Sequence, residues 1–236
     1  ARVIGHQAQI GIGAGIAGSC AAFKLAEAGF CVAVFEKEAE AAQAGSGNQQ
    51  GMLYLKLSPS LTYQNDLLIL GFEQTLQLLQ QLTRQGLLTK GVDWDDCGVL
   101  QLAYNEGEAR GQEKLAARYP KTLLQPLSKR EASRIAGVPL SSGGIFFPTA
   151  GWVAPRAFTQ ALLSHPNIVL ETGVTVHELH QHTSPEQFER LSEADKFAAL
   201  QWELRGEKTT PKGQETCCYR AKVVVLANAE KVINFS

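Results

Sequence analysis

The chain has 236 residues, of which 22 are basic, 23 are acidic and 44% are hydrophobic. This length suffices for one large domain or two small ones, and the balanced charge excludes a strong overall field toward nucleic acid or a membrane, though not a local basic face. Five cysteines without C-x-x-C spacing, no apolar run of membrane-spanning length and no signal peptide predict a reduced, cytoplasmic chain without a membrane segment.

The first 36 residues show the order of elements that opens a Rossmann-like nucleotide-binding domain. An apolar run ends at residues 8–12, GAGIAG fills residues 13–18, and a helix is expected over residues 19–28. A second buried strand is expected over residues 31–35 and ends at Glu36. Strand, glycine turn, helix, strand and acid all fall at the spacing of a dinucleotide site.

Each part of this motif has a physical role in holding a dinucleotide. Gly13 allows the tight turn, Gly15 lets the backbone approach a pyrophosphate, and Gly18 lets the helix pack closely on the strand. The helix N-terminus offers N–H groups and a partial positive charge to the phosphates. Glu36 can accept hydrogen bonds from both ribose hydroxyls, and its charge disfavours NADP because it would repel a 2′-phosphate.

A polar, glycine-punctuated stretch, QAGSGNQQGMLY, follows at residues 43–54. Its three glycines relax the backbone, while its serine, asparagine and glutamines supply hydroxyl and amide partners. The stretch therefore either tracks along a long cofactor or forms a solvated loop that binds nothing.

The remaining elements alternate between helices and short strands. Helices are expected over residues 65–85, 106–119, 128–136 and 155–164, and strands over residues 99–104, 168–170, 174–176 and 223–227. The composition of residues 223–227 predicts that this last strand is buried. Leu68, Phe72, Thr75, Leu79 and Leu82 form an apolar stripe of core residues on the first of these helices. Ser128 and Glu131 have the spacing of a capping box.

Several stretches carry a family resemblance. GIGAGIAG at residues 11–18 and VAVFE at residues 32–36 resemble the amino-terminal signature of the FAD-dependent amine oxidases of the D-amino acid oxidase superfamily. Residues 44–58, 93–106 and 144–158 are similar to one group within it, the flavin half of the bifunctional enzymes of tRNA 5-methylaminomethyl-2-thiouridine biosynthesis. VVVLANAEKVINF, near the end of the chain, resembles the family's strand that returns to the flavin.

The resemblance implies an α/β fold in which a Rossmann-like FAD-binding domain is interleaved with an α+β substrate domain. We expect residues 1–85 and 148–236 to form the FAD-binding domain and residues 86–147 part of the substrate domain, with a surface excursion over residues 182–216. The chain opens with Ala1 and contains one methionine. It also stops before the family's long C-terminal continuation, so we expect a fragment truncated at its C-terminus.

The function implied is FAD-dependent oxidation of the carboxymethylaminomethyl group on the wobble uridine of tRNA. This reaction releases glyoxylate and leaves aminomethyl-uridine, with tRNA as substrate and a methyltransferase domain elsewhere in the parent chain. Because the flavin performs the difficult chemistry, no catalytic side chain is assigned. Two alternatives stay open: an oxidase of free amino acids such as glycine or D-amino acids, and a non-catalytic nucleotide-binding fragment.

The resemblance also implies a set of cofactor contacts. Lys37 either flanks the adenosine or is an ordinary surface lysine, and Val174 is the adenine neighbour, with Val176 nearly as good. Ala229 stands where the family usually has glycine, so its methyl would crowd a close approach. The expected FAD-binding residues are Gly13, Gly15, Ile16, Ala17, Gly18, Glu36, Lys37, Ser46, Asn48, Gln49, Gln50, Gly51, Met52, Val174, Ala227, Asn228 and Ala229.

Three further features have more ordinary interpretations. His177, His180 and His182 have loosely metal-like spacing, but without a surrounding acid or cysteine cluster we expect a solvated strand end and no metal site. Trp152 faces the substrate cavity or packs beneath it. A local basic patch is either a solvated helix face or a contact for tRNA phosphates. The patch consists of Lys121, Lys129, Arg130 and Arg134.

Overall fold

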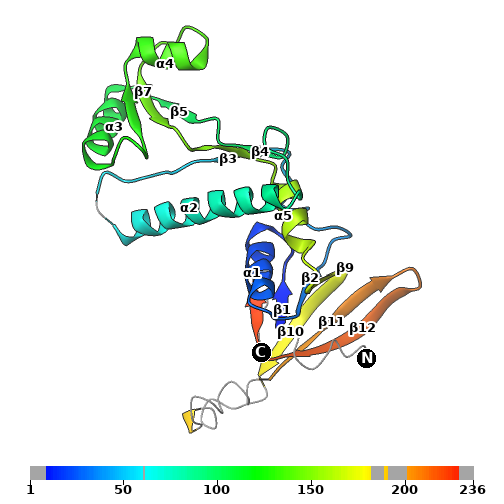
Figure 1. The fold of residues 1–236 in the computed structure, drawn as a ribbon. Helices are drawn as coiled ribbons and strands as arrows, with labels where there is room; N and C mark the ends of the chain where they lie inside the picture. Colours follow the sequence, from blue (N-terminus) through cyan, green and yellow to red (C-terminus); the bar gives the residue numbers. More distant parts are fainter. Residues whose placement is uncertain (1–8, 61, 182–188, 191–200, 229–236) are drawn as a thin grey trace. The chain divides into compact units, whose positions relative to one another are not determined.

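The computed structural model describes residues 9–60, 62–181, 189–190 and 201–228. The chain forms two compact units (Figure 1). The first unit combines Ala1–Gln49 with Pro155–Ser236, and the second is the continuous segment Gln50–Ala154.

The first unit is an α/β unit that contains two sheets. Its elements are β1 (Gln9–Ile12), α1 (Ile16–Glu27), β2 (Val32–Glu36), the 3-10 turn η1 (Gly45–Gly47), α5 (Pro155–Leu163), β9 (Ile168–Thr172), β10 (Val174–Gln181), β11 (Trp202–Thr210), β12 (Gly213–Ala221) and β13 (Val224–Leu226).

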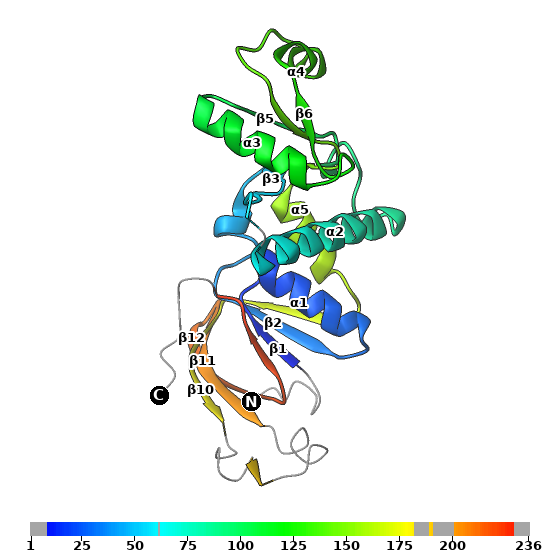
Figure 2. The same cartoon turned by 90° about the vertical axis from the view of Figure 1, so that its left-hand side faces the viewer.

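The first sheet of this unit is parallel throughout, with strand order β13-β1-β2-β9. Every residue of β1 and the first four residues of β2 are buried, which explains why these strands read as continuous apolar runs. Helix α1 contacts the sheet (Figure 2) through a stripe of buried residues that includes Ala22 and Phe23. β13 is only partly buried, although we expected a buried strand there.

The second sheet is antiparallel, with order β10-β11-β12, and packs on the first (Figure 2). Ile10, Ile12 and Phe35 from the parallel strands share one core with Val174 and Leu204 from the antiparallel sheet. The unit therefore has three layers: helices, a parallel sheet and an antiparallel sheet.

This sheet corrects the expected surface excursion. Residues 202–210 and 213–216 belong to the paired strands β11 and β12, and Leu204 is fully buried. Residues 182–188 and 191–200 of the expected excursion lie outside the described residues. The sequence of β11 indicated a surface excursion because its core residue, Leu204, is flanked by the charged residues Glu203 and Arg205. Glu203 is buried, yet it is stabilised there by Arg205 at 2.8 Å and Arg220 at 3.2 Å.

The second unit combines helices with two small antiparallel sheets, of order β5-β7-β6 and β3-β8-β4. Its elements are β3 (Gly51–Leu53), α2 (Tyr63–Arg84), β4 (Trp94–Asp95), β5 (Val99–Leu102), α3 (Glu106–Arg118), β6 (Gln125–Leu127), α4 (Lys129–Ala136), β7 (Gly144–Phe147) and β8 (Gly151–Val153).

The units divide at residues 49/50 and 154/155, whereas we expected divisions at 85/86 and 147/148. Helix α2 lies in the second unit because Phe72 shares a core with Val99 and Phe147. β8 lies there too, because it pairs with both β3 and β4. On α2 the expected stripe is buried at Phe72, Leu79 and Leu82, but Leu68 is 37% exposed.

The sequence correctly predicted both ends of α4. Ser128 Oγ accepts the Glu131 N–H, and the Glu131 carboxylate accepts the Ser128 N–H at 2.8 Å, which completes the capping box. Gly137 ends the helix in the left-handed conformation, at φ +70°.

Candidate functional site

The turn between β1 and α1 is shaped by a strand from the far end of the chain. β13 runs parallel to β1, with Ile12 opposite Leu226, and this pairing brings Ala227 over the turn. Gly13 has φ +101°, and a Cβ there would lie 2.5 Å from the Ala227 carbonyl oxygen. Both the dihedral angle and the space exclude any other residue at this position.

Gly18 performs the packing role expected of it. It is buried in the first turns of α1, where an added Cβ would lie 1.9 Å from the Gly13 carbonyl oxygen. Gly15 differs, since its φ of −83° suits any residue. A Cβ on Gly15 would meet Ser46 Oγ at 3.2 Å, so its missing side chain keeps backbone accessible.

Backbone donors and one carboxylate converge at the start of α1. The Ile16 N–H donates to Ser46 Oγ at 3.1 Å, which caps a helix whose own N-cap residue, Gly15, has no side chain. The Ala14 N–H donates to Glu36 Oε2 at 2.9 Å. Because α1 points its N-terminus here, the partial positive charge of the helix also falls at this point.

These groups line a cavity of about 330 Å³ in the first unit, close to the carboxyl ends of β1 and β2. Its position follows the rule that parallel α/β sheets bind ligands at the carboxyl ends of their strands. The cavity is lined by Ile12, Gly13, Gly15, Ile16, Ala17, Phe35, Glu36, Lys37, Ala44, Gly45, Ser46, Val174, Thr175, Val176, Ala227 and Asn228.

Most of the residues expected from the sequence meet at this cavity. Ten of them line it, from five separate places in the chain: Gly13, Gly15, Ile16, Ala17, Glu36, Lys37, Ser46, Val174, Ala227 and Asn228. Lys37 is exposed and lies 3.0 Å from Glu38.

The other expected residues do not line the cavity. Gly18 is buried behind the turn, and Asn48 and Gln49 are exposed and lie outside the lining. Three more belong to the second unit: exposed Gln50, and Gly51 and Met52 in β3. Ala229 lies outside the described residues.

The sequence reasoning missed five lining residues, which are mostly apolar: Ile12, Phe35, Ala44, Gly45 and Thr175. Val176, the alternative to Val174, also lines the cavity. Position along a strand could have identified part of this set. Ile12 and Phe35 directly precede Gly13 and Glu36, and Thr175 follows Val174 in β10.

The cavity suits the adenosine diphosphate part of a dinucleotide. A glycine turn, a helix N-terminus and a carboxylate are the groups that bind pyrophosphate and ribose. Glu36 and Lys37 are the ionisable side chains among the described residues that line it. The Glu36 carboxylate accepts the Ala14 and Glu38 N–H groups, and Lys37 is paired with Glu38, so these two side chains provide binding groups at the cavity.

The other features singled out from the sequence lie elsewhere. His177 and His180 are on β10, where His180 Nε2 lies 3.0 Å from Glu178 Oε2, and His182 is outside the described residues. Within the described ranges no three His, Cys, Asp or Glu side chains gather closely enough to hold a metal ion. Trp152 lies in β8, half-buried. Among the residues that the structure describes, no helix has the length and apolar character needed to cross a bilayer.

Comparisons with known proteins agree with this geometry. Residues 12–232 match the family model of the FAD dependent oxidoreductases. The tRNA 5-methylaminomethyl-2-thiouridine biosynthesis bifunctional protein MnmC of Pseudomonas putida is 43% identical over 224 residues, which are 95% of this chain and 30% of that protein. The protein of the same name from Stutzerimonas stutzeri is 39% identical over 234 residues, 99% of this chain and 31% of its own length. The chain thus spans about a third of the length of these relatives.

Among solved structures, glycine oxidase from Geobacillus kaustophilus superposes with a TM-score of 0.65. The two are 22% identical, and the match covers 93% of this chain and 54% of the other. At this identity the likeness bears on the fold, and it confirms the predicted D-amino acid oxidase-like α/β class.

Proposed function

The chain belongs to the family of FAD-dependent oxidoreductases, and we propose that it is the flavin-binding part of an enzyme that oxidises the carboxymethylaminomethyl group on the wobble uridine of tRNA. The observation that carries the proposal is 43% identity, across 95% of the chain, to a protein of tRNA 5-methylaminomethyl-2-thiouridine biosynthesis. The parent chain would carry a separate methyltransferase domain and act in the cytoplasm.

The cavity of the first unit would hold the adenosine diphosphate end of FAD. The 13–18 turn and the N-terminus of α1 bind the pyrophosphate, and Glu36 binds the ribose through oxygens that already accept the Ala14 and Glu38 N–H groups. Val174 contacts the adenine from β10. The proposed flavin-side contacts are Ser46, Asn48, Gln49, Gln50, Gly51, Met52, Ala227, Asn228 and Ala229.

FAD, when bound, supplies the two-electron oxidation of a C–H bond next to an amine nitrogen. The residues of this chain bind the cofactor, orient it and exclude water from it. Oxidation of the substituent would give an imine, which water hydrolyses to release the glycine unit as glyoxylate and leave aminomethyl-uridine on the tRNA. Molecular oxygen would take the two electrons from the reduced cofactor.

The decisive experiment combines a flavin titration with an activity assay. The purified chain is titrated with FAD by visible absorbance, and the longer parent chain is assayed for glyoxylate with tRNA bearing the carboxymethylaminomethyl group and, separately, with free glycine. We expect a flavin spectrum and glyoxylate from tRNA alone. Glyoxylate from free glycine alone would instead indicate an amino-acid oxidase, and a colourless protein that takes up no FAD would indicate a non-catalytic fragment.

A matched pair of variants ties the flavin to the cavity. Glu36→Ala removes the carboxylate that accepts the Ala14 N–H, so we expect FAD affinity to fall by about tenfold or more, as for loss of a charge-assisted hydrogen bond. Glu38→Ala removes the same charge two residues away, at an exposed side chain outside the lining, and should leave FAD affinity within about twofold. Equal affinities in the two variants would contradict the assignment of Glu36.

A further inference from the structure

Positive charge is concentrated in one stretch of the second unit. Residues 110–134 contain seven basic and two acidic side chains, a net charge of +5, whereas the whole chain carries −1. This stretch begins within α3, passes through β6 and ends within α4, and both helices contact β6 and β7. Over the whole of these elements, residues 106–136, Glu106 and Glu108 in the first turn of α3 reduce the net charge to +3. The fold therefore gathers the excess positive charge of the chain on one small subdomain.

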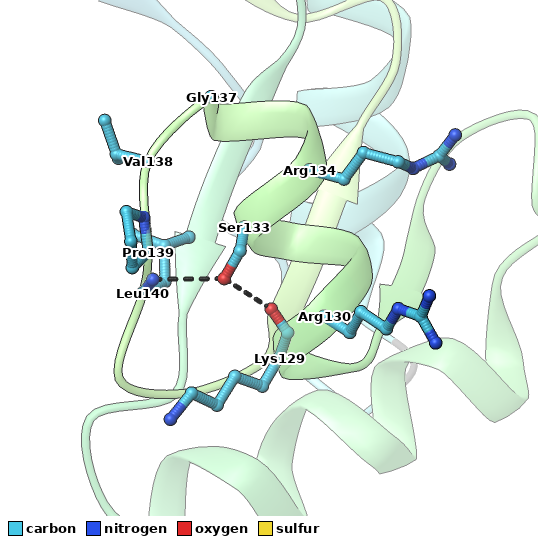
Figure 3. Close-up of a pocket in the computed structure, with 8 residues that line it drawn as sticks. All are labelled: Lys129, Arg130, Ser133, Arg134, Gly137, Val138, Pro139 and Leu140. Atoms are coloured by element: carbon cyan, nitrogen blue, oxygen red, sulfur yellow. Dashed lines mark hydrogen bonds between the residues drawn. The ribbon is translucent and has the colours of Figure 1, made fainter.

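Within that stretch, α4 presents its cations openly. Figure 3 shows Arg130 and Arg134 extending from the same side of the helix, with Lys129 on its other flank. The two arginines are one turn apart, about 6 Å along the axis of a helix. All three side chains are exposed, and none of them lies within 4 Å of a carboxylate in the described ranges of the chain.

The acidic residue of α4, Glu131, is engaged at the helix start. Its carboxylate bonds to the backbone N–H and the hydroxyl of Ser128, and these two bonds lower its pKa. On α3, by contrast, Arg110 is paired with Glu106 at 3.4 Å, and Arg118 donates to the Pro59 carbonyl. Of the four arginines in residues 110–134, the two of α4 are thus left available to an outside anion.

The backbone that carries these side chains is firmly held. Ser133 Oγ donates to the Lys129 carbonyl at 2.8 Å and accepts the Leu140 N–H at 3.0 Å (Figure 3), which ties the loop after Gly137 back to the helix. Helix and loop together line an open hollow of about 810 Å³. Arginines on a fixed backbone lose less freedom on binding, which favours recognition of a rigid, repeating anion.

We propose that the α4 surface, defined as Lys129, Arg130 and Arg134, binds the phosphate backbone of tRNA. The proposal rests on the function proposed above, which supplies tRNA as the partner. Guanidinium groups match phosphate oxygens bidentately, and such contacts position a nucleic acid without reading its sequence. A membrane is the poorer partner, because α4 has two turns and a single large apolar side chain exposed, Ile135.

The test measures tRNA and FAD binding on the same protein. Binding of a fluorescent tRNA transcript is followed by anisotropy over a range of salt concentrations, for the wild-type chain and for R130Q/R134Q. We expect the double variant to bind roughly tenfold more weakly at low salt. Its slope of log K against log salt should be shallower by about 2, because each lost phosphate contact removes about 1. FAD affinity should not change, since neither arginine lines the cavity of the first unit.

Two control variants separate phosphate binding from net charge. K24Q/K212Q removes two positive charges from exposed sites of the first unit and should leave tRNA affinity within about twofold. R130K/R134K keeps the charge but loses the bidentate fork, so it should retain the salt slope with a smaller loss of affinity.

The outcomes distinguish this surface from the flavin site. A wild-type chain that binds FAD but no tRNA, or a double variant that binds tRNA as tightly as wild type, overturns the α4 surface and leaves the flavin site intact. Equal binding of the wild-type chain to phosphatidylglycerol vesicles and to tRNA also overturns it, in favour of a membrane. A wild-type chain that binds tRNA but takes up no FAD counts against the proposed function and not against this surface.

Discussion

The cavity of the first unit and the α4 surface of the second would, as proposed here, recognise phosphate by opposite means. The cavity is built from backbone, with Gly13 and Gly18 set against carbonyl oxygens and donors fixed by a helix N-terminus. The α4 surface is built from exposed cationic side chains on a capped helix. A site made of backbone fails when a side chain is added, whereas a site made of side chains fails only when they are removed.

The sharpest test of this difference is Gly18→Ala. The added methyl would lie 1.9 Å from the Gly13 carbonyl oxygen, so backbone must move. We expect a loss of about 3 kcal/mol in the free energy of unfolding, together with loss of FAD binding. Urea denaturation and the flavin titration measure the two effects.

Gly71→Ala is the matched control for this variant. Gly71 lies in the interior of α2, and a Cβ there meets nothing within 4 Å. The same substitution should therefore stabilise the chain by about 0.5–1 kcal/mol. If Gly18→Ala proved as harmless as Gly71→Ala, the cavity would not depend on the close approach of α1 to the turn.

Ser46→Ala tests the hydroxyl that caps α1. Ser46 Oγ accepts the Ile16 N–H at 3.1 Å, and Gly15 cannot replace it as a cap. We expect a loss of about 1 kcal/mol in the absence of cofactor, as for other N-cap hydroxyls. Ser46→Thr keeps the hydroxyl and should recover most of the loss in thermal denaturation. Identical melting of the alanine and threonine variants would contradict the cap.

The most local of the expected effects lies in the second unit, at the α4 capping box. Ser128→Ala should cost about 1 kcal/mol locally and leave FAD binding unchanged. Amide hydrogen exchange in residues 129–136 measures this loss directly. Equal protection of residues 129–136 in wild type and in Ser128→Ala would show that packing alone stabilises α4.

The same box predicts a pH dependence. Its hydrogen bonds to Ser128 lower the pKa of Glu131 below the ordinary value of 4.5. The carboxylate therefore stabilises α4 fully above pH 4.5, and this contribution is lost as pH falls through the lowered pKa. Protection of the α4 amides, measured as exchange relative to the intrinsic rate at each pH, should fall over that acidic range in wild type but not in Glu131→Gln. An equal acid response in both would assign the effect to other groups.

The sequence predicted best what local chemistry dictates. The glycine turn, the strand before it and the acid after the second strand were placed correctly because each depends on near neighbours. The α4 capping box was predicted for the same reason. Family resemblance added residues distant in sequence, such as Val174 and Ala227, which the fold brings to one cavity.

The sequence failed where burial depends on partners far along the chain. β11 looked polar because Glu203 is buried only with the help of Arg220, on the neighbouring strand. The division between the units was misplaced because the burial of Phe72 depends on contacts with β5 and β7, which the helical pattern of α2 does not reveal. Pairwise compensation of this kind leaves no periodic signal in a single sequence.

The pairing of β13 with β1 also sets an order for events during synthesis. The second unit is one continuous segment and has its whole core once residue 154 has emerged from the ribosome. The turn at Gly13 is completed much later, because the Ala227 carbonyl that packs against it is synthesised near the end of the chain. The nascent chain therefore carries an unfinished parallel sheet, with an open edge at β1, after every residue of the second unit has been made. We accordingly expect the first unit, whose sheet pairs strands far apart in sequence, to be the slower of the two to fold.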